Sequence, residues 1–360
     1  MAKSISELDK NLKIETSFHE PDAVWHDIRE EPFDIYGLYK PLEGHSFMRM
    51  DPAVAEATNE GVMYLNRHTA GGRVRFRTDA QYIIVKALCP KPGPMGHMAF
   101  VGIAGLDCYA SENGGEYIFQ GSVIPPFSTE DSFEGCIRFP DRKMREIMFH
   151  FPLYGGMNDL YFALPGDAVL EHGKRYRDLK PALFYGSSIT QGGCASRPGT
   201  GYTNLISNLL DMDHVNLGFS GSARAEAAMV DYLSKQETSI FVCDYDHNAP
   251  NVEHLKATHE PLYKAFRAAQ PDTPILFLSK PDARPGRKDD DARRAVIMET
   301  YERAKANGDK NVWFVDGADL FKGPNRFDCT VDGCHPTDLG FHRMAQVIGA
   351  KMAEILDIRL

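Results

Sequence analysis

The pattern of hydrophobic residues changes near residue 175, and this change constrains the fold more than any other feature of the sequence. From about residue 60 to 165, short apolar or alternating runs such as "RVRFR" and "YIIVKAL" are separated by turns rich in Gly and Pro. From about residue 181, strand-like runs alternate with amphipathic helical segments. One hydrophobic core rarely serves a chain of 360 residues. We therefore expect two domains, residues 1–175 and 176–360.

The first half has the pattern of an antiparallel β domain. Runs such as "EYIFQGSVI", "GCIRFP" and "EIMFHFPLY" are short, bounded by turn residues and almost without helical periodicity. Regularly spaced short strands of this kind are typical of a sandwich or jelly roll. We predict an all-β, jelly-roll-like sandwich.

The second half predicts an α/β domain. Five strand-like runs, "PALFYG", "HVNLGFS", "SIFVCDYD", "PILFLSK" and "NVWFVDG", are each followed by a helical pattern. At the carboxyl end of the chain, apolar residues at helical spacing form a single face: Phe341, Ala345, Ile348, Met352 and Ile355. Alternation of this length predicts a parallel sheet covered by helices on both sides, a three-layer α/β/α domain.

Polar and small residues follow the carboxyl ends of these strands, where ligands bind in open parallel sheets. They are Gly186, Ser187 and Ser188 after the first strand, Ser220, Gly221 and Ser222 after the second, Asp246, His247 and Asn248 after the third, and Asp332 and His335 after the last. Acyl transfer at a serine needs a hydroxyl, a base, an acid that orients the base, and donors for an oxyanion. This edge of the sheet supplies a candidate for every role.

The short spacing of Asp332 and His335 lets the carboxylate hold one ring nitrogen while the other faces a serine. The backbone N–H groups of Ser188 and Gly221, with the amide of Asn248, are the candidate oxyanion donors. Structural roles are open for the same residues, because serines cap helices and Asp and Asn occupy turns. Their joint placement at one edge favours the catalytic interpretation.

Four sequence blocks resemble those of the SGNH, or GDSL-type, hydrolases. "GSSIT" is similar to the block G-D-S-[LI]-T, with Ser187 in place of the usual Asp, and "NLGFSG", "DHN" and "DGCHPTDLG" are similar to the three later blocks. "GLDCY", residues 105–109, resembles the G-x-D-L-Y signature of a sandwich domain that precedes the hydrolase domain in one subgroup, and "FPLYGG" also resembles that subgroup. The resemblance implies that Ser188 is the nucleophile, with Asp332 and His335 as its partners.

The resemblance implies a serine esterase that hydrolyses a small acyl ester, an acetyl ester above all, carried by a small molecule or a carbohydrate. The reaction would pass through an acyl-enzyme and need neither a metal nor an organic cofactor. We expect substrate contacts from His247 and Arg284. Three alternatives stay open: an acyltransferase with the same serine, a non-catalytic carbohydrate-binding protein, and a metal-dependent phosphoesterase built on Asp244, Asp246, His247, Asp332 and His335.

Composition and charge indicate which binding partners and which cellular compartment to expect. The net charge of −10 and the absence of a long Lys/Arg block disfavour nucleic acids and anionic membranes. Without a signal-peptide pattern or a run of eighteen apolar residues, we expect a cytoplasmic protein with no membrane contact; assembly into a homo-oligomer is left open. The seven cysteines are dispersed and lack C-x-x-C spacing, which argues against disulfides or a zinc motif and predicts that most of them are reduced packing residues.

Overall fold

Two antiparallel sheets packed face to face form the amino-terminal body of the computed structural model, which describes residues 16–282 and 289–359. The first sheet has the order β1 (Ala23–Asp27), β9 (Asp159–Pro165), β4 (Tyr82–Leu88) and β7 (Ser132–Arg138). The second has the order β10 (Leu170–Glu171), β3 (Arg73–Thr78), β8 (Arg145–His150), β5 (Leu106–Ser111) and β6 (Ile118–Val123), with β2 (Asp34–Tyr36) paired to β3. The predicted sandwich is confirmed.

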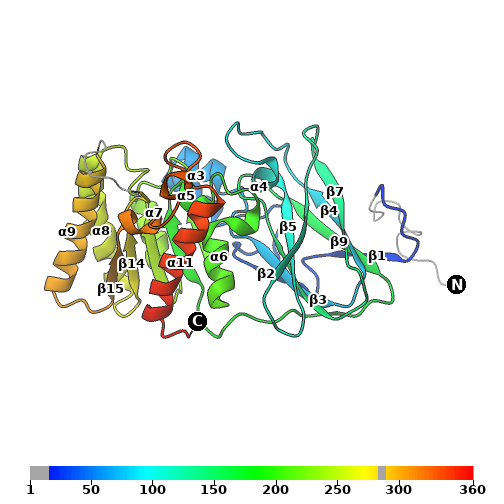
Figure 1. Cartoon of the computed structure of the whole chain (residues 1–360). Coiled ribbons are helices and arrows are strands. Elements are labelled where there is room, and N and C mark those ends of the chain that lie inside the picture. The colour runs from blue at the N-terminus through cyan, green and yellow to red at the C-terminus, as the bar shows by residue number, and fades with distance from the viewer. Residues whose placement is uncertain (1–15, 283–288, 360) are drawn as a thin grey trace.

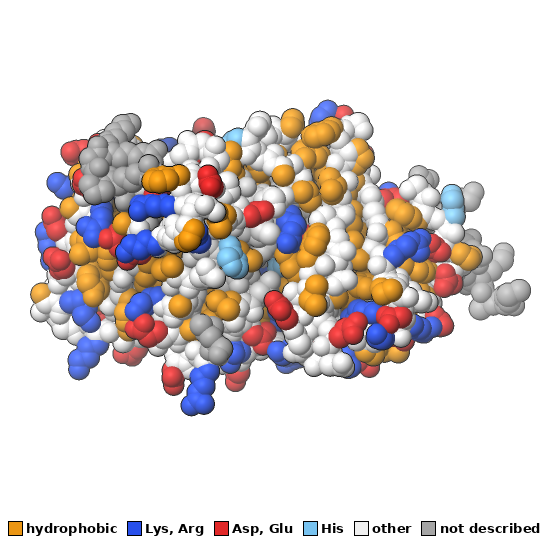
Figure 2. Space-filling view, in the orientation of Figure 1, with side chains coloured by type: hydrophobic (Ala, Val, Ile, Leu, Met, Phe, Trp, Pro, Cys, Tyr) orange, Lys and Arg blue, Asp and Glu red, His pale blue; other side chains and the backbone are white. Residues whose placement is uncertain are grey.

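Alternate residues of these strands fill the space between the two sheets. Phe76 on β3, Phe149 on β8 and Phe162 on β9 are fully buried, and the rings of Phe149 and Phe162 lie 4.8 Å apart. Neighbouring side chains of a strand point to opposite faces, so every second residue of each strand packs against the facing sheet. Figure 2 shows hydrophobic side chains also gathered on the outer surface of this body. Exposed large hydrophobic side chains of this body include Ile118, Phe119, Ile124 and Phe127.

The described residues of the first half include three short helices, so the expectation of an all-β half is wrong there. They are α2 (Pro52–Thr58), α3 (Glu60–Leu65) and α4 (Phe100–Ala104). Helices of one or two turns show too few repeats to be recognised by periodicity. Ala55 of α2 and Val62 of α3 pack into the core of the second body, beside α7. The boundary near residue 175 stays a prediction, since the chain crosses between the two bodies more than once.

The second body contains the predicted parallel sheet. Its strands are β11 (Ala182–Gly186), β12 (His214–Gly218), β13 (Ile240–Asp244), β14 (Ile275–Leu278) and β15 (Val312–Val315), in the order β12-β11-β13-β14-β15. All five match the runs identified in the sequence. The order reverses beside β11, which is where a parallel sheet opens a crevice for ligands.

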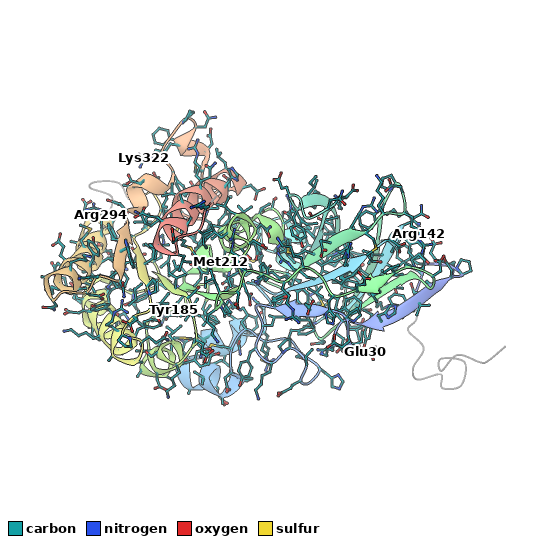
Figure 3. The ribbon with its side chains drawn as sticks, turned by 90° about the horizontal axis from the view of Figure 1, so that it is seen from below. Glu30, Arg142, Tyr185, Met212, Arg294 and Lys322 are labelled. Carbon is teal, nitrogen blue, oxygen red and sulfur yellow. The ribbon has the colours of Figure 1, made fainter. Side chains whose placement is uncertain are left out.

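Helices cover both faces of this sheet (Figure 1). One layer holds α5 (Ser188–Gln191), α6 (Tyr202–Leu210), α10 (Gly317–Leu320) and α11 (Asp338–Ile355), and the other holds α7 (Ala227–Ser234), α8 (Val252–Ala269) and α9 (Asp290–Ala306). On β11, Phe184 faces the first layer and Tyr185 the second. In Figure 3, Tyr185 and Met212 lie among the packed side chains of this body, and Arg142 lies at the far end of the sandwich. Every helix of the described residues is too short or too polar to span a bilayer.

Buried polar contacts join the two bodies. Arg49, only 1% exposed, donates to the carbonyl oxygens of Asn216 and Gly218 at the end of β12. Arg73, also buried, forms an ion pair with Asp213 just before that strand. Because buried charges are costly unless paired and hydrogen-bonded, these contacts hold the sandwich in one position against the sheet.

All seven cysteines lie in the described part of the chain and are free thiols. Five are buried in the two cores: Cys89, Cys108, Cys194, Cys243 and Cys329. The prediction of unpaired packing cysteines is confirmed.

Candidate active site

The two adjacent serines at the end of β11 have different positions in the turn that leads into α5. Ser187 is the N-cap: it is fully buried, and its hydroxyl accepts a hydrogen bond from the N–H of Ile189 at 3.2 Å. Its own N–H donates to the carbonyl oxygen of Asp244 at 3.0 Å, which ties the turn to β13. Since Ser187 caps the helix, the structural role considered for Ser188 is already filled. The hydroxyl of Ser188 is therefore free to face the sheet edge.

Ser188, His335 and Asp332 form a continuous chain of hydrogen-bonded side chains. Ser188 Oγ lies 2.9 Å from His335 Nε2, and His335 Nδ1 lies 2.7 Å from Asp332 Oδ2. The other carboxylate oxygen, Asp332 Oδ1, accepts from the N–H groups of Cys334 and His335 at 2.9 and 2.8 Å. The loop before α11 thus holds the carboxylate from its own backbone and brings the imidazole to the end of β11.

The surroundings of Asp332 keep its carboxylate ionised. Partial burial by itself raises the pKa of Asp332, but the hydrogen bonds from the His335 ring and from two backbone N–H groups outweigh it and lower the pKa to about 2. An ionised carboxylate at this position accepts the Nδ1–H of His335 and leaves Nε2 as an acceptor for a serine proton. The arrangement can therefore remove a proton from Ser188.

Two of the predicted oxyanion donors, both backbone N–H groups, have no hydrogen-bond acceptor among the described residues. Within the described part of the chain, the N–H of Ser188 and that of Gly221 take part in no internal hydrogen bond. Gly221 has a φ of +68°, and a Cβ placed there would meet no atom within 4 Å, so the loop after β12 exposes its backbone at this point. Free backbone donors beside a nucleophile are what an oxyanion requires.

The third candidate donor, Asn248, points at the same loop. Its Nδ2 donates to the carbonyl oxygen of Phe219 at 2.7 Å, which orients the amide and uses one of its two N–H bonds. The neighbouring Ser220 N–H is not available, because it donates to Gln191 Oε1 at 3.0 Å. Gln191 was missed by the sequence analysis; as a buried residue of α5 it shapes the loop after β12.

The sandwich reaches the site with residues that sequence reasoning did not assign. The hydroxyl of Tyr154 lies 3.4 Å from the carbonyl oxygen of Ser188. The ring of His97, from the loop before α4, stands edge-on to His335 with 5.7 Å between centroids. Tyr154 belongs to "FPLYGG", so the resemblance marked its segment, whereas His97 lies in a Gly- and Pro-rich loop without a recognisable pattern.

A pocket of about 470 Å³ opens between the sandwich and the loop after β12. Its lining combines aromatic, apolar and hydroxyl groups, among them Tyr64, His68, Met95, Tyr154, Ser220 and Ser222. Tyr64 is 64% exposed, so its ring face is available to a ligand. Tyr154 of this lining also contacts the carbonyl oxygen of Ser188.

The remaining predicted site residues are less exposed or fall outside the structure described. His247 is only 9% exposed and packs behind the loop of His335, with its Nδ1 3.8 Å from Cys334 Sγ. Its contact with substrate stays a prediction. Arg284 lies outside the described residues.

The residues proposed for a metal-dependent phosphoesterase do not assemble. Asp244 accepts from Thr190 Oγ1 at 2.9 Å, and Asp246 accepts from the N–H of Lys280 at 3.1 Å. Across residues 16–282 and 289–359, neither carboxylate belongs to a group of three or more metal-ligating side chains. Asp244 and Asp246 instead support the strand ends.

The fold and the site together define a class: a three-layer α/β/α hydrolase with a serine, a histidine and an aspartate at the carboxyl edge of its sheet, preceded by a β-sandwich. The model of the GDSL-like lipase/acylhydrolase family matches residues 179–353. The model of GxDLY, the N-terminus of SGNH-hydrolase-type esterases, matches residues 23–170. The chain belongs to this family of ester-hydrolysing enzymes, in the subgroup with the GxDLY domain.

Solved structures share the whole two-domain architecture. A candidate GDSL-like lipase from Bacteroides ovatus is 26% identical, with a TM-score of 0.84 over 94% of this chain and 99% of that one. A salicylyl-acyltransferase from a tetracycline biosynthetic pathway is 18% identical, with a TM-score of 0.75 over 95% and 100% of the two chains. An acetyl xylan esterase from the rumen bacterium Butyrivibrio proteoclasticus is 13% identical, with a TM-score of 0.59 over 93% and 99%. No curated protein matches the sequence.

Proposed function

We propose that the protein is a serine esterase that removes a small acyl group, most simply acetyl, from a carbohydrate ester. One observation carries the proposal. Ser188 Oγ lies 2.9 Å from the free nitrogen of an imidazole whose other nitrogen is held by Asp332 at 2.7 Å. This is the geometry that turns a serine hydroxyl into a nucleophile.

In the first half of the reaction, Ser188 Oγ attacks the ester carbonyl carbon while His335 Nε2 takes the hydroxyl proton. Asp332 stabilises the imidazolium without accepting its proton. The negative charge on the tetrahedral oxygen is met by the N–H groups of Ser188 and Gly221, with the amide of Asn248 as the third donor. The bond to the alcohol then breaks, His335 returns the proton to the leaving oxygen, and the acyl group stays on Ser188.

In the second half, water replaces the alcohol. His335 removes a proton from the water, the hydroxyl attacks the acyl carbon, and the carboxylic acid leaves as Ser188 recovers its proton. Each step uses side chains of this chain and solvent. An acceptor alcohol in place of water would make the same site an acyltransferase.

A carbohydrate as the alcohol part is supported by the pocket that Tyr154 lines and by the architecture. The pocket is larger than an acetyl group needs, and it presents the exposed ring of Tyr64 together with two serine hydroxyls. Sugars bind through an apolar ring face and hydroxyl hydrogen bonds, so this lining suits them. The acetyl xylan esterase of the same architecture acts on such a substrate.

Acyl transfer is the second candidate. A salicylyl-acyltransferase is similar over nearly the full length of both chains. The two activities differ only in what attacks the acyl-enzyme, so product analysis separates them. We expect hydrolysis of acetylated xylo-oligosaccharides to yield free acetate even with acceptor sugars in excess; acylated acceptor as the main product would favour transfer.

The nucleophile is tested by Ser188→Ala with p-nitrophenyl acetate and a fluorophosphonate probe. The variant should lose roughly a thousandfold or more in turnover, and the probe should fail to label it. Ser187→Ala is the matched control, because it removes the neighbouring hydroxyl but leaves Ser188 Oγ, and it should still be labelled. Labelling of Ser188→Ala at the wild-type rate would overturn the assignment.

A further inference from the structure

Three potential metal ligands from separate segments meet beside Ser188. His97 comes from the sandwich loop before α4, Cys194 from the turn after α5, and His335 from the loop before α11. Their ligand atoms all lie within 4.8 Å of one another. The first two take no part in the proposed reaction, and no spacing in the sequence connects the three.

Two imidazoles and a thiol are the ligand types that Zn²⁺ prefers, and three protein ligands leave a fourth position for water. Tetrahedral bonds of ordinary length place such ligand atoms about 3.4 to 3.6 Å apart. The cluster therefore has to contract by roughly 1 Å. His97 can supply this movement, because it is exposed and lies at the end of a loop with no regular secondary structure.

We propose that His97, Cys194 and His335 form a binding site for Zn²⁺ that switches the esterase off. Asp332 occupies Nδ1 of His335 at 2.7 Å, so the ion takes Nε2, the atom that otherwise faces Ser188 at 2.9 Å. The ion then replaces the serine as the partner of the imidazole, and the thiol proton of Cys194 passes to solvent. The inhibitory effect rests on the proposed function, whereas the binding site itself does not.

The surroundings of His335 favour such a site. A carboxylate that holds the second nitrogen of a metal-bound histidine orients the ring and strengthens the bond, and Asp332 is already in that position. The sandwich supplies one ligand and the hydrolase body two, so the ion would also tie His97 to the rim of the active site. The site therefore depends on the docking of the two bodies.

Binding is tested on the full chain by calorimetry with Zn²⁺ and by absorption with Co²⁺. We expect a thiolate-to-cobalt charge-transfer band, and we expect His97→Ala and Cys194→Ser each to weaken Zn²⁺ binding roughly tenfold or more. His45→Ala and Cys136→Ser change a histidine and a cysteine of the sandwich away from the cluster, and they should bind as the wild type does. A cobalt spectrum without the band, or a band that Cys334→Ser abolishes and Cys194→Ser does not, would overturn the site.

Inhibition is tested by titrating Zn²⁺ into the p-nitrophenyl acetate assay, with each variant scaled to its own metal-free rate. Zn²⁺ should abolish wild-type activity and excess EDTA should restore it, whereas His97→Ala should need roughly tenfold more Zn²⁺. Zn²⁺ that raises the rate, or binds without inhibiting, would contradict the switch. Calorimetry on Ser188→Ala keeps the two proposals apart, because this variant should bind Zn²⁺ whether or not Ser188 is the nucleophile.

Discussion

Asp107 of the sandwich lies 3.0 Å from Arg197 of the hydrolase body and accepts a second hydrogen bond from the N–H of Gly199 at 2.8 Å. Its other oxygen lies 3.1 Å from His150 Nδ1. Asp107 is the Asp of "GLDCY", so in this protein the signature residue of the sandwich is a link between the two bodies. The segment it holds leads from α5, which begins at Ser188, to α6.

Breaking this link should destabilise the protein strongly. Asp107→Ala removes a fully buried carboxylate that Arg197, His150 and the N–H of Gly199 share, and we expect a loss of about 3 to 5 kcal/mol in the free energy of unfolding. Urea denaturation measures it. The control Asp231→Ala removes an ion pair with Lys235 in which both side chains are about two-thirds exposed, and it should cost less than about 1 kcal/mol. Equal effects of the two substitutions would show that Asp107 is no link.

Asp332 should matter for turnover more than for folding. Asp332→Asn removes the charge that orients the imidazole, and its amide can present an N–H to His335 Nδ1 and so hold the ring with the wrong nitrogen protonated. We expect kcat to fall by roughly a hundredfold or more, with KM little changed. Steady-state kinetics at neutral pH measures both values. If the variant were as active as the wild type, Asp332 would have no role in the mechanism.

Gly193 should tolerate no side chain. A Cβ at this position would lie 2.9 Å from the Tyr154 hydroxyl, 3.0 Å from the Ser188 carbonyl oxygen and 3.3 Å from His335 Cδ2. Gly193→Ala therefore has to displace groups on which the Ser188–His335 contact depends, and we expect at least a tenfold loss in kcat/KM, because small misplacements of reacting groups are costly. In Gly96→Ala the added Cβ meets nothing within 4 Å, which makes this variant the matched steric control. Equal kinetics for both variants would contradict the packing described.

A buried histidine away from the site should make stability depend on pH. His259 on α8 is 2% exposed, and its Nδ1 lies 2.9 Å from Thr300 Oγ1. Burial lowers the pKa of His259 from 6.5 to about 3, with Glu260 opposing weakly. Between these two pKa values the unfolded chain binds a proton that the folded protein does not. The free energy of unfolding is therefore higher at neutral pH and decreases as the pH falls through this range.

His259→Gln should therefore flatten the acid side of the stability curve. From about pH 7.5 to about pH 5 the wild type should lose about 2 kcal/mol more than the variant, whatever the variant's stability at neutral pH. Urea unfolding at the two pH values gives the difference. His45→Gln, at a histidine whose side chain is 95% exposed, should follow the wild-type curve. A His259→Gln curve parallel to the wild type would contradict the assignment.

The strands of the hydrolase sheet and the side chains after them could be predicted from the sequence, because both depend on local patterns. Apolar runs such as "PALFYG" bury both faces of a strand wherever they occur, and carboxyl ends of parallel strands share one edge. This is why Ser188, Asp332 and His335 were placed together before their contacts were known. Local patterns alone did not separate the roles of the two serines: the resemblance to GDSL-type hydrolases singled out Ser188, whereas the choice of Ser187 as the N-cap depends on how the turn is held against β13.

The contributions of the sandwich were decided by tertiary structure alone. His97 and Tyr154 reach Ser188 and His335 only because buried charges such as Arg49, Arg73 and Asp107 dock one body against the other in a single orientation. Periodicity and spacing indicate the local structure of a segment. They carry no information on how two folded bodies pack against each other. The sequence by itself therefore determined which side chains gather at the sheet edge, whereas the walls of the site and the cluster of His97, Cys194 and His335 depended on long-range packing.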